Sequence, residues 1–198
     1  MENLSRSSSS SDTQNKKNTK KIINDIFDVI ELIAIAFGII LLFSAFFFRH
    51  SVVSGNSMQN TLQNGEHVLI SDFLYDVQAN DIIVCQLEAE QTQRFPHISS
   101  KEPLIKRVIA TEGQRVKIVD GKVYVNGIEI KEDYVFRDGT DSILNMPEIT
   151  VSENHVFIMG DHRNDSLDSR YFGEVDSRLI LGRVILRIFP IEKMGKVK

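Results

Sequence analysis

The chain has 198 residues, and its composition excludes several classes of protein before any motif is considered. This length accommodates one domain with a substantial core in addition to a short tail and an anchor. A formal charge of -4, from 27 acidic and 23 basic residues, provides no basic surface for nucleic acid, so no nucleic-acid partner is expected. Because Cys85 is the single cysteine, no internal disulfide can form, and the core alone must stabilise the fold.

The first 21 residues form a polar and basic segment. They include six serines between Ser5 and Ser11, and five basic residues against two acidic ones. Apolar residues do not recur in them at helical or strand spacing. The composition therefore predicts a disordered tail over residues 1–21.

An apolar run without charges follows at residues 32–48. Its 17 residues are at the short end of what a membrane helix needs, and Val29 and Ile30 lengthen it. The run ends in Phe-Phe-Phe-Arg at 46–49, whereas a cleaved signal would end in small residues, so it predicts an uncleaved anchor over residues 22–49. The lysines before the run place the N-terminus in the cytoplasm. We therefore expect a single-pass protein of the cell membrane, in contact with lipid, whose residues 50–198 form an extracytoplasmic domain.

Beyond the anchor the pattern changes to short β-type runs separated by turns. Asp120-Gly121 and Asn126-Gly127 are strong signals for tight turns between strands. The expected strands are residues 67–71, 81–86, 104–111, 115–119, 122–125, 155–159 and 180–189. The polar stretch 88–102, which contains Pro96, is expected to be an exposed hairpin or loop. The sequence thus predicts a mostly β protein, with one transmembrane helix followed by an antiparallel β-sheet domain.

Ser57 is the first residue that could carry chemistry. It lies in a Gly/Asn-rich loop just beyond the anchor, where a serine is also a common turn residue. A serine hydroxyl becomes a good nucleophile only with a positioned base and with donors for the oxyanion. The five histidines show no spacing with acids that would indicate a catalytic triad: His50, His67, His97, His155 and His162.

Lys106 is a different candidate for the base. It interrupts an apolar run at 104–110, where strand alternation places it on the same face as Leu104 and Val108. Burial there would favour the neutral amine and lower the pKa of the lysine from about 10.4, so that the amine could accept the serine proton. The alternative is an edge-strand lysine whose ammonium group reaches the solvent. No cluster of His, Cys, Asp and Glu has the spacing of metal ligands, so neither a metal nor another cofactor is expected.

Four stretches, in order, resemble the four sequence boxes of bacterial type I signal peptidases, the serine-lysine leader peptidases. They are Ser-Gly-Asn-Ser-Met-Gln-Asn-Thr-Leu at 54–62, Asn-Asp-Ile-Ile-Val at 80–84, Ile-Lys-Arg-Val-Ile-Ala-Thr-Glu-Gly at 105–113 and Gly-Asp-His-Arg-Asn-Asp-Ser-Leu-Asp-Ser-Arg at 160–170. Each stretch alone is weakly specific, but the ordered set behind an anchor is specific. The resemblance covers about residues 22–190. It implies a membrane-bound serine endopeptidase that removes N-terminal signal peptides from exported preproteins.

The resemblance also implies roles for individual residues. Ser57 would be the nucleophile, Lys106 the general base, and Ser166 the hydroxyl that holds the lysine amine in place. Two ion pairs would support the site from behind, Asp161 with Arg107 and Asp168 with Arg170. Small apolar pockets, which accept alanine at the first and third positions before the cut, would be lined by Val53, Met58, Leu62 and Ile105.

The chain departs from the family pattern at a few positions. Asn60 stands where proline is usual, Asn80 where glycine is common, and His162 where asparagine is common. His162 is expected to have a structural or solvent-facing role, and Cys85 to be a buried and inert thiol. Gly55 stands where some members have a serine that assists the oxyanion, so the Ser57 amide is expected to be the main oxyanion donor.

Two other functions are compatible with the same pattern. One is a self-cleaving, repressor-type serine-lysine protease, against which the membrane segment and the lack of a helix-turn-helix pattern argue. The other is a membrane-anchored β-rich binding protein of the same fold that lacks activity. The presence of Ser57, Lys106 and Ser166 together argues against the inactive protein.

Overall fold

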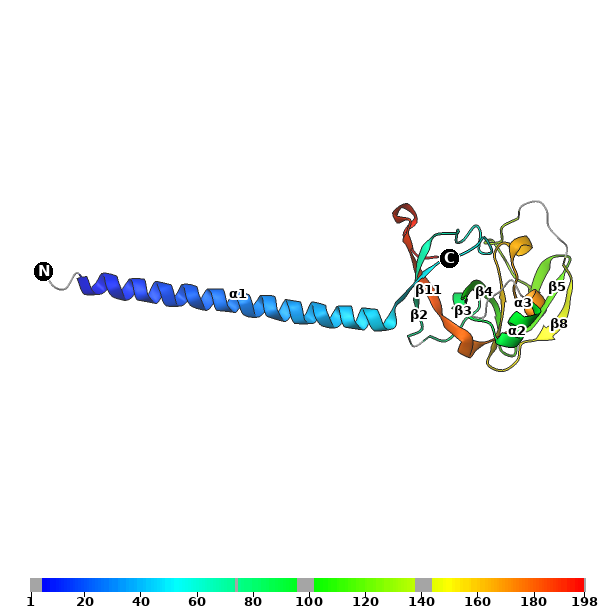
Figure 1. Cartoon of the computed structure of the whole chain (residues 1–198), viewed down its shortest axis with the longest axis horizontal. Coiled ribbons are helices and arrows are strands. Elements are labelled where there is room, and N and C mark those ends of the chain that lie inside the picture. Colours follow the sequence, from blue (N-terminus) through cyan, green and yellow to red (C-terminus); the bar gives the residue numbers. More distant parts are fainter. Residues whose placement is uncertain (1–4, 74, 96–101, 138–143, 198) are drawn as a thin grey trace. The chain divides into compact units, whose positions relative to one another are not determined.

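The structure is a computed structural model that describes residues 5–73, 75–95, 102–137 and 144–197. The chain divides into two compact units, an N-terminal helical unit that ends at Phe46 and a β-rich unit that begins at Phe47. Figure 1 draws the long helix α1 and the strands of the β-rich unit. The mostly β, antiparallel fold class predicted from the sequence is confirmed.

Helix α1 spans Ser5–Phe47. Its part Ile23–Phe47 has 25 residues and includes an 18-residue window with a mean hydropathy of 2.6, so it is long and apolar enough to cross a membrane. Residues 5–21 belong to the same helix, which corrects the prediction of a disordered tail for them. Once an apolar helix is nucleated, extending it costs little, and the lysines and glutamine of this segment are good helix formers.

The larger sheet has seven antiparallel strands in the order β1-β2-β11-β3-β4-β9-β10. Their bounds are β1 (Arg49–Val52), β2 (His67–Ser71), β3 (Ile82–Cys85), β4 (Leu104–Thr111), β9 (His155–Met159), β10 (Val175–Asp176) and β11 (Ile180–Phe189). Strand β4 lies between β3 and β9, so its residues are buried from Ile105 to Ala110. A lysine inside that stretch is therefore removed from solvent.

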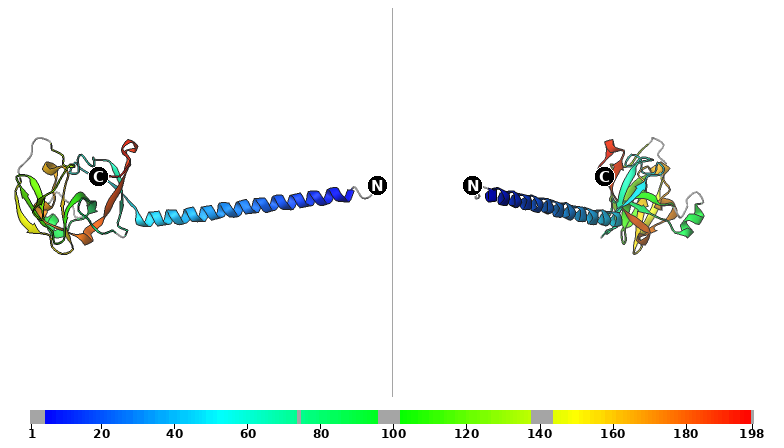
Figure 2. Two further views of the ribbon diagram at one scale, coloured as in Figure 1. Left: turned by 180° about the vertical axis from the view of Figure 1, so that it is seen from behind. Right: turned by 60° about the vertical axis from the view of Figure 1, so that its left-hand side comes forward.

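A second sheet of four strands has the order β7-β6-β5-β8. Its strands are β5 (Arg115–Val119), β6 (Lys122–Val125), β7 (Ile128–Glu129) and β8 (Met146–Thr150). Within the β-rich unit, β5 and β8 lie at the end opposite β2 and β11 (Figures 1 and 2). The predicted turns at 120–121 and 126–127 have positive φ angles at all four residues, as tight hairpin turns require.

Apolar side chains form three buried clusters among the described residues. The first lies around β2, β3 and the beginning of β4, and includes Val53, Met58, Leu62 and Ile105. The second includes Ile83 and Val108, and the third joins the end of β4 and β9 to the smaller sheet. Strand β4 contributes to all three clusters, so the core fixes this strand firmly.

Within the described part of the β-rich unit, the helices and 3₁₀ turns are short. The helices are α2 (Ala89–Arg94) and α3 (Ser169–Phe172), and the 3₁₀ turns are η1 (Arg163–Asp165), η2 (Ser177–Leu179) and η3 (Ile191–Lys193). Helix α2 corrects part of the prediction of a hairpin or loop over residues 88–102. Glu88 and Gln91 form a capping box at its N-terminus, which satisfies the free amides of a single helical turn. Residues 96–101 of that stretch lie outside the described part of the chain.

Candidate active site

Ser57 lies in the loop between β1 and β2, here called the Ser57 loop (residues 54–64). Two backbone hydrogen bonds close its base, from the Val53 amide to the Glu66 carbonyl at 2.8 Å and from the Gly65 amide to the Val53 carbonyl at 2.9 Å. Met58 is 1 % exposed, and its side chain packs in the first apolar cluster of the core. The loop therefore holds the Ser57 hydroxyl in a fixed place without a regular element.

Lys106 lies near the beginning of β4, opposite Ile83 of β3. It is only 3 % exposed. Its Nζ lies 2.7 Å from Ser57 Oγ and 3.2 Å from the carbonyl oxygen of Ile105. Strand pairing and the Ser57 loop thus bring together two residues that are 49 positions apart in the chain.

The protonation of Lys106 follows from this burial. Burial disfavours the ammonium form and lowers the pKa of Lys106 below that of a free lysine, and the nearby Asp168 carboxylate opposes the effect only in part. A larger share of the amine is therefore neutral than for a lysine in solvent. A neutral amine within hydrogen-bond distance of a hydroxyl can accept its proton.

Ser166 and Gly160 lie close to the backbone of Ser57. Ser166 is 9 % exposed, and its Oγ makes no hydrogen bond among the described residues. The contact with the Lys106 amine that the resemblance implies is therefore not formed in this structure, and the role of Ser166 stays a prediction. A Cβ at position 160 would lie 2.2 Å from Ser166 Oγ and 2.5 Å from the carbonyl oxygen of Ser57. Only glycine fits between the two serines.

Arg107 and Asp161 form the ion pair expected from the resemblance. Arg107 Nε lies 2.8 Å from Asp161 Oδ1, and Nη2 lies 2.7 Å from Oδ2. The side chains are 3 % and 1 % exposed. Thr61 Oγ1 donates a hydrogen bond to the same carboxylate. The pair therefore ties strand β4 to the Ser57 loop and to the 160–170 segment.

Asp168 and Arg170 form a second buried pair. Arg170 Nε lies 2.7 Å from Asp168 Oδ1, and Nη2 lies 2.8 Å from Oδ2. The same carboxylate accepts a hydrogen bond from the amide of Gly160 at 2.9 Å, and Arg170 Nη2 donates a hydrogen bond to the Arg163 carbonyl at 2.7 Å. These bonds fold the 160–170 segment onto itself, and this places Ser166 beside Gly160.

Three further supports were not predicted from the sequence. Thr61 belongs to the first sequence box, but its hydrogen bond to Asp161 joins residues that are 100 positions apart, so the sequence does not indicate it. The ring of Tyr134 lies under the Arg107 guanidinium, 3.9 Å from ring centroid to Cζ. Glu132 pairs with Arg163, both nearly buried, with 3.0 Å between Arg163 Nη1 and Glu132 Oε2. A glutamate and a tyrosine two positions apart in a polar connection carry no signal that would reveal these contacts.

The four residues predicted to line the substrate pockets belong to a single apolar cluster: Val53, Met58, Leu62 and Ile105. Each is at most 9 % exposed. They are therefore close together, and their role in binding a substrate stays a prediction.

The structure describes the surroundings of three departures from the family pattern and of the single cysteine. Asn80 has φ +73°, a conformation that favours glycine and that asparagine tolerates. The Gly55 amide donates to Asn64 Oδ1 at 3.0 Å. His162 is buried with its ring against Phe136, and its amide donates to the Ser57 carbonyl at 3.0 Å, so its role is structural rather than solvent-facing. Cys85 is fully buried, and burial raises the pKa of its thiol to about 12, as expected of an inert residue.

Comparisons with known proteins identify the family of the chain. A protein from Synechocystis with the name "Probable signal peptidase I-1" is 32 % identical over 172 residues, 85 % of each chain. "Signal peptidase I P" of Bacillus subtilis subsp. natto is 30 % identical over 194 residues, 92 % of this chain and 98 % of the other. A crystal structure of a signal peptidase I from Enterococcus faecalis has 26 % identity and a TM-score of 0.45, and covers 56 % of this chain and 97 % of its own. The model of the family described as "Signal peptidase, peptidase S26" matches residues 26–189. The chain therefore belongs to the signal peptidase family, peptidase S26.

Proposed function

We propose that this peptidase is an anchored serine endopeptidase that removes signal peptides from exported preproteins, with Ser57 as nucleophile and neutral Lys106 as general base. One observation carries the proposal: the buried amine of Lys106 lies 2.7 Å from the hydroxyl of Ser57. In this geometry a single proton transfer activates the serine. Membership of the signal peptidase family supplies the class of substrate.

The chemistry then follows in two halves. As Ser57 Oγ attacks the scissile carbonyl carbon, its proton passes to Lys106 Nζ, and the amide of Ser57 stabilises the oxyanion. The resulting ammonium protonates the leaving amine, which frees the mature protein and leaves an ester on Ser57. Lys106 next takes a proton from water, which attacks the ester, and returns that proton to Ser57 as the signal peptide leaves.

Two buried ion pairs keep the reacting groups in place. Arg107 follows Lys106 directly in β4, so its bidentate bond to Asp161 limits rotation of the strand beside the base. Asp168 bonds to Gly160 and Arg170, and Ser166 lies beside Gly160. Ser166 is proposed to accept a hydrogen bond from the neutral amine, which would direct the lone pair of Lys106 at Ser57.

The helix at the N-terminus is proposed to anchor the enzyme in the cell membrane. The lysines before Ile23–Phe47 favour a cytoplasmic N-terminus, because basic residues accumulate on the cytoplasmic side of a span. The domains would then be a cytoplasmic tail (1–21), an anchor (22–49) and an extracytoplasmic peptidase domain (50–198). Exported preproteins reach the same side of the membrane.

Substrates are proposed to bind as an extended strand beside the site, with side chains of alternate positions entering pockets. Val53, Met58, Leu62 and Ile105 belong to one closely packed apolar cluster, which is proposed to leave room only for small residues such as alanine at positions -1 and -3. The inactive binding protein is disfavoured by the contact between Lys106 and Ser57, which binding alone does not require. The repressor-type protease is disfavoured by the family match, which extends over the membrane helix.

A processing assay with a model preprotein tests this function. The preprotein with alanine at -1 and -3 should be cut once, after the -1 alanine. Phenylalanine at -1 should slow the cut about tenfold or more, because a ring overpacks a small pocket at about 1–3 kcal/mol. The products are identified by mass.

Two variants accompany the assay as controls. Ser57→Ala should process nothing, whereas Ser152→Ala, which changes an exposed serine between β8 and β9, should match the parent. Equal rates for the alanine and phenylalanine substrates, or processing by Ser57→Ala, would exclude the proposed function.

A further inference from the structure

The segment that follows β11 turns back along the end of that strand. After η3 the chain runs antiparallel to β11, with the Arg187 amide donating to the Gly195 carbonyl at 2.9 Å and the Gly195 amide donating to the Arg187 carbonyl at 3.1 Å. Residues 194–197, here called the return segment, thereby form a short hairpin with the end of β11. Its direction leads Val197 back over the domain.

The hairpin is fastened to the Ser57 loop. Lys193 Nζ donates to Gln63 Oε1 at 3.0 Å and lies 3.4 Å from Glu66 Oε1. Arg187 Nη1 donates to the carbonyl of Thr61 at 3.1 Å and to Glu66 Oε2 at 2.8 Å. Glu66 is 3 % exposed, so both cations meet a carboxylate that is shielded from solvent. The base of the hairpin is therefore held against the loop that carries the nucleophile.

The tip of the return segment packs against the first apolar cluster of the core. Val197 contacts the apolar cluster that contains Val53, Met58, Leu62 and Ile105. It is only partly buried there, and it enters the cluster from a short hairpin rather than from a core strand. A small branched apolar side chain on an extended segment thus occupies a place suited to a residue of a bound peptide.

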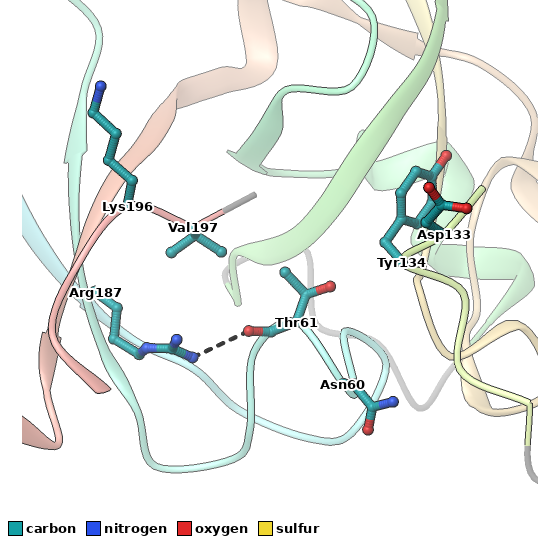
Figure 3. A pocket seen from close by; sticks show the side chains of 7 residues that line it. All are labelled: Asn60, Thr61, Asp133, Tyr134, Arg187, Lys196 and Val197. Carbon is teal, nitrogen blue, oxygen red and sulfur yellow. Dashed lines mark hydrogen bonds between the residues drawn. The ribbon is translucent and has the colours of Figure 1, made fainter. Parts of the chain in front are cut away.

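Two cavities meet at the return segment. One, of about 530 Å³, is lined by residues of the Ser57 loop, by Tyr134 and by Arg187, which Figure 3 shows with its guanidinium directed at the carbonyl of Thr61. The other, of about 290 Å³, is lined by residues 80–82, where β3 begins, and by residues 183–185 of β11. Lys196 and Val197 line both cavities. The return segment therefore separates two spaces that would otherwise adjoin.

We propose that the return segment is an internal occupant of the substrate groove, which the signal peptide displaces when it binds. The inference rests on the proposed function, because it takes the cluster around Ile105 as the surface for residues -1 and -3. Val197 then stands in for a small apolar residue of the substrate. Without a substrate it covers the apolar surface that would otherwise be exposed to water.

The first test is kinetic and uses the full-length enzyme with a signal peptide substrate. Val197→Asp replaces an apolar side chain with a carboxylate, and burying an unpaired charge in the apolar cluster is unfavourable, so the segment should leave the groove. The apparent dissociation constant of the substrate is the intrinsic constant divided by the fraction of enzyme whose groove is open. If the segment blocks the groove of the parent about nine-tenths of the time, the KM of the variant should therefore be about tenfold lower than that of the parent, at unchanged kcat. Ile191→Asp, in the exposed turn of the same hairpin, should behave as the parent. A rise in KM would mean that Val197 is a fixed wall of the pocket and would overturn the proposal.

The second test does not depend on the effect of a charge on folding. Val197→Cys is combined with Ser57→Ala, and the rate of maleimide labelling is measured with and without a saturating uncleaved signal peptide. Cys85 is fully buried and should not react. Displacement of the segment should raise the labelling rate at least severalfold.

Peptide binding is measured in parallel by fluorescence anisotropy. This measurement distinguishes a failure of the internal-occupant proposal from a failure of the proposed peptidase function. A bound peptide with an unchanged or reduced labelling rate would overturn the internal occupant and leave the peptidase function intact. A peptide that does not bind, together with an uncut preprotein, would refute the proposed function and with it this inference.

Discussion

Gly160 shows how much of the site depends on a single missing methyl group. It lies between the hydroxyl of Ser166 and the backbone of Ser57, and the Ser57 backbone is held in place because the amide of His162 also donates to the Ser57 carbonyl. An added Cβ would have to move one of the two serines. The distance between Ser57 and Lys106 would change with it.

Gly160→Ala should therefore lower kcat/KM by at least about tenfold and destabilise the domain by about 1–3 kcal/mol, the usual cost of overpacking. Activity is measured with a signal peptide substrate, and stability by urea unfolding. Gly121→Ala is the matched control, because its Cβ meets open space while its φ of +74° still strains the backbone. The control should lose stability but keep its kcat/KM. Parent-like activity of Gly160→Ala would mean that the spacing of the two serines does not matter.

At the residue scale, the sequence predicted best those residues whose environment is set by the strand on which they lie. Lys106 interrupts an apolar run, and a run of that kind becomes an interior strand, so its burial could be predicted. The bond from Thr61 to Asp161 and the stacking of Tyr134 on Arg107 could not, because they join separate connections whose approach depends on the whole fold. The role of Ser166 could be predicted only from the resemblance to the family, and the described contacts contain no hydrogen bond between its hydroxyl and the Lys106 amine.

Strand β4 is the element that organises the site. It contributes to all three apolar clusters and carries Ile105, Lys106 and Arg107 in succession, which face the proposed pocket, the nucleophile and the supporting carboxylate. The buried pair of Arg107 and Asp161 joins this strand to the 160–170 segment. Loss of this ion pair should lower both the free energy of unfolding and the activity.

Arg107→Met should destabilise the domain by about 3–5 kcal/mol, because it leaves the Asp161 carboxylate buried without its partner. Arg115→Met removes an ion pair with Glu148 whose side chains are 55 % and 39 % exposed, and it should cost less than about 1 kcal/mol. Urea unfolding of both variants makes the comparison. A double variant, Arg107→Met with Asp161→Leu, should recover much of the lost stability. If Arg107→Met is no more destabilising than Arg115→Met, the buried pair does not support the strand.

At the element scale, long strands with strong apolar content could be predicted almost residue by residue. The bounds of β2, β4, β5, β6, β9 and β11 agree with the predicted ranges, and β3 differs by one residue at each end. Four strands were missed: β1, β7, β8 and β10. β7 and β10 have two residues each, and β1 and β8 are mostly exposed, so tertiary pairing rather than apolar content makes them strands.

For the whole molecule, the proposed arrangement is a cytoplasmic N-terminus, one membrane span and an outer peptidase domain. External protease added to intact protoplasts should digest the domain from residue 50 onward and spare a tag on residue 1, because the basic flank stays inside. Permeabilised protoplasts provide the control, in which the tag should also be lost. Loss of the tag from intact protoplasts would reverse the orientation and contradict a role in processing exported preproteins.

The central claim of this account is that a neutral lysine activates a serine, and the pH dependence of kcat/KM tests it most directly. Burial lowers the pKa of Lys106, and only the unprotonated amine can accept the proton. The rate of the parent should therefore rise with pH along a single ionisation and level off below the pKa of about 10.4 of a free lysine.

Two variants complete the measurement. Lys106→Arg should be inactive at every pH, because arginine keeps its proton, with a pKa above about 12. Lys122→Arg, an exposed lysine of β6, should follow the profile of the parent. A parent rate that does not rise with pH, or appreciable cleavage by folded Lys106→Arg, would show that Lys106 is not the base.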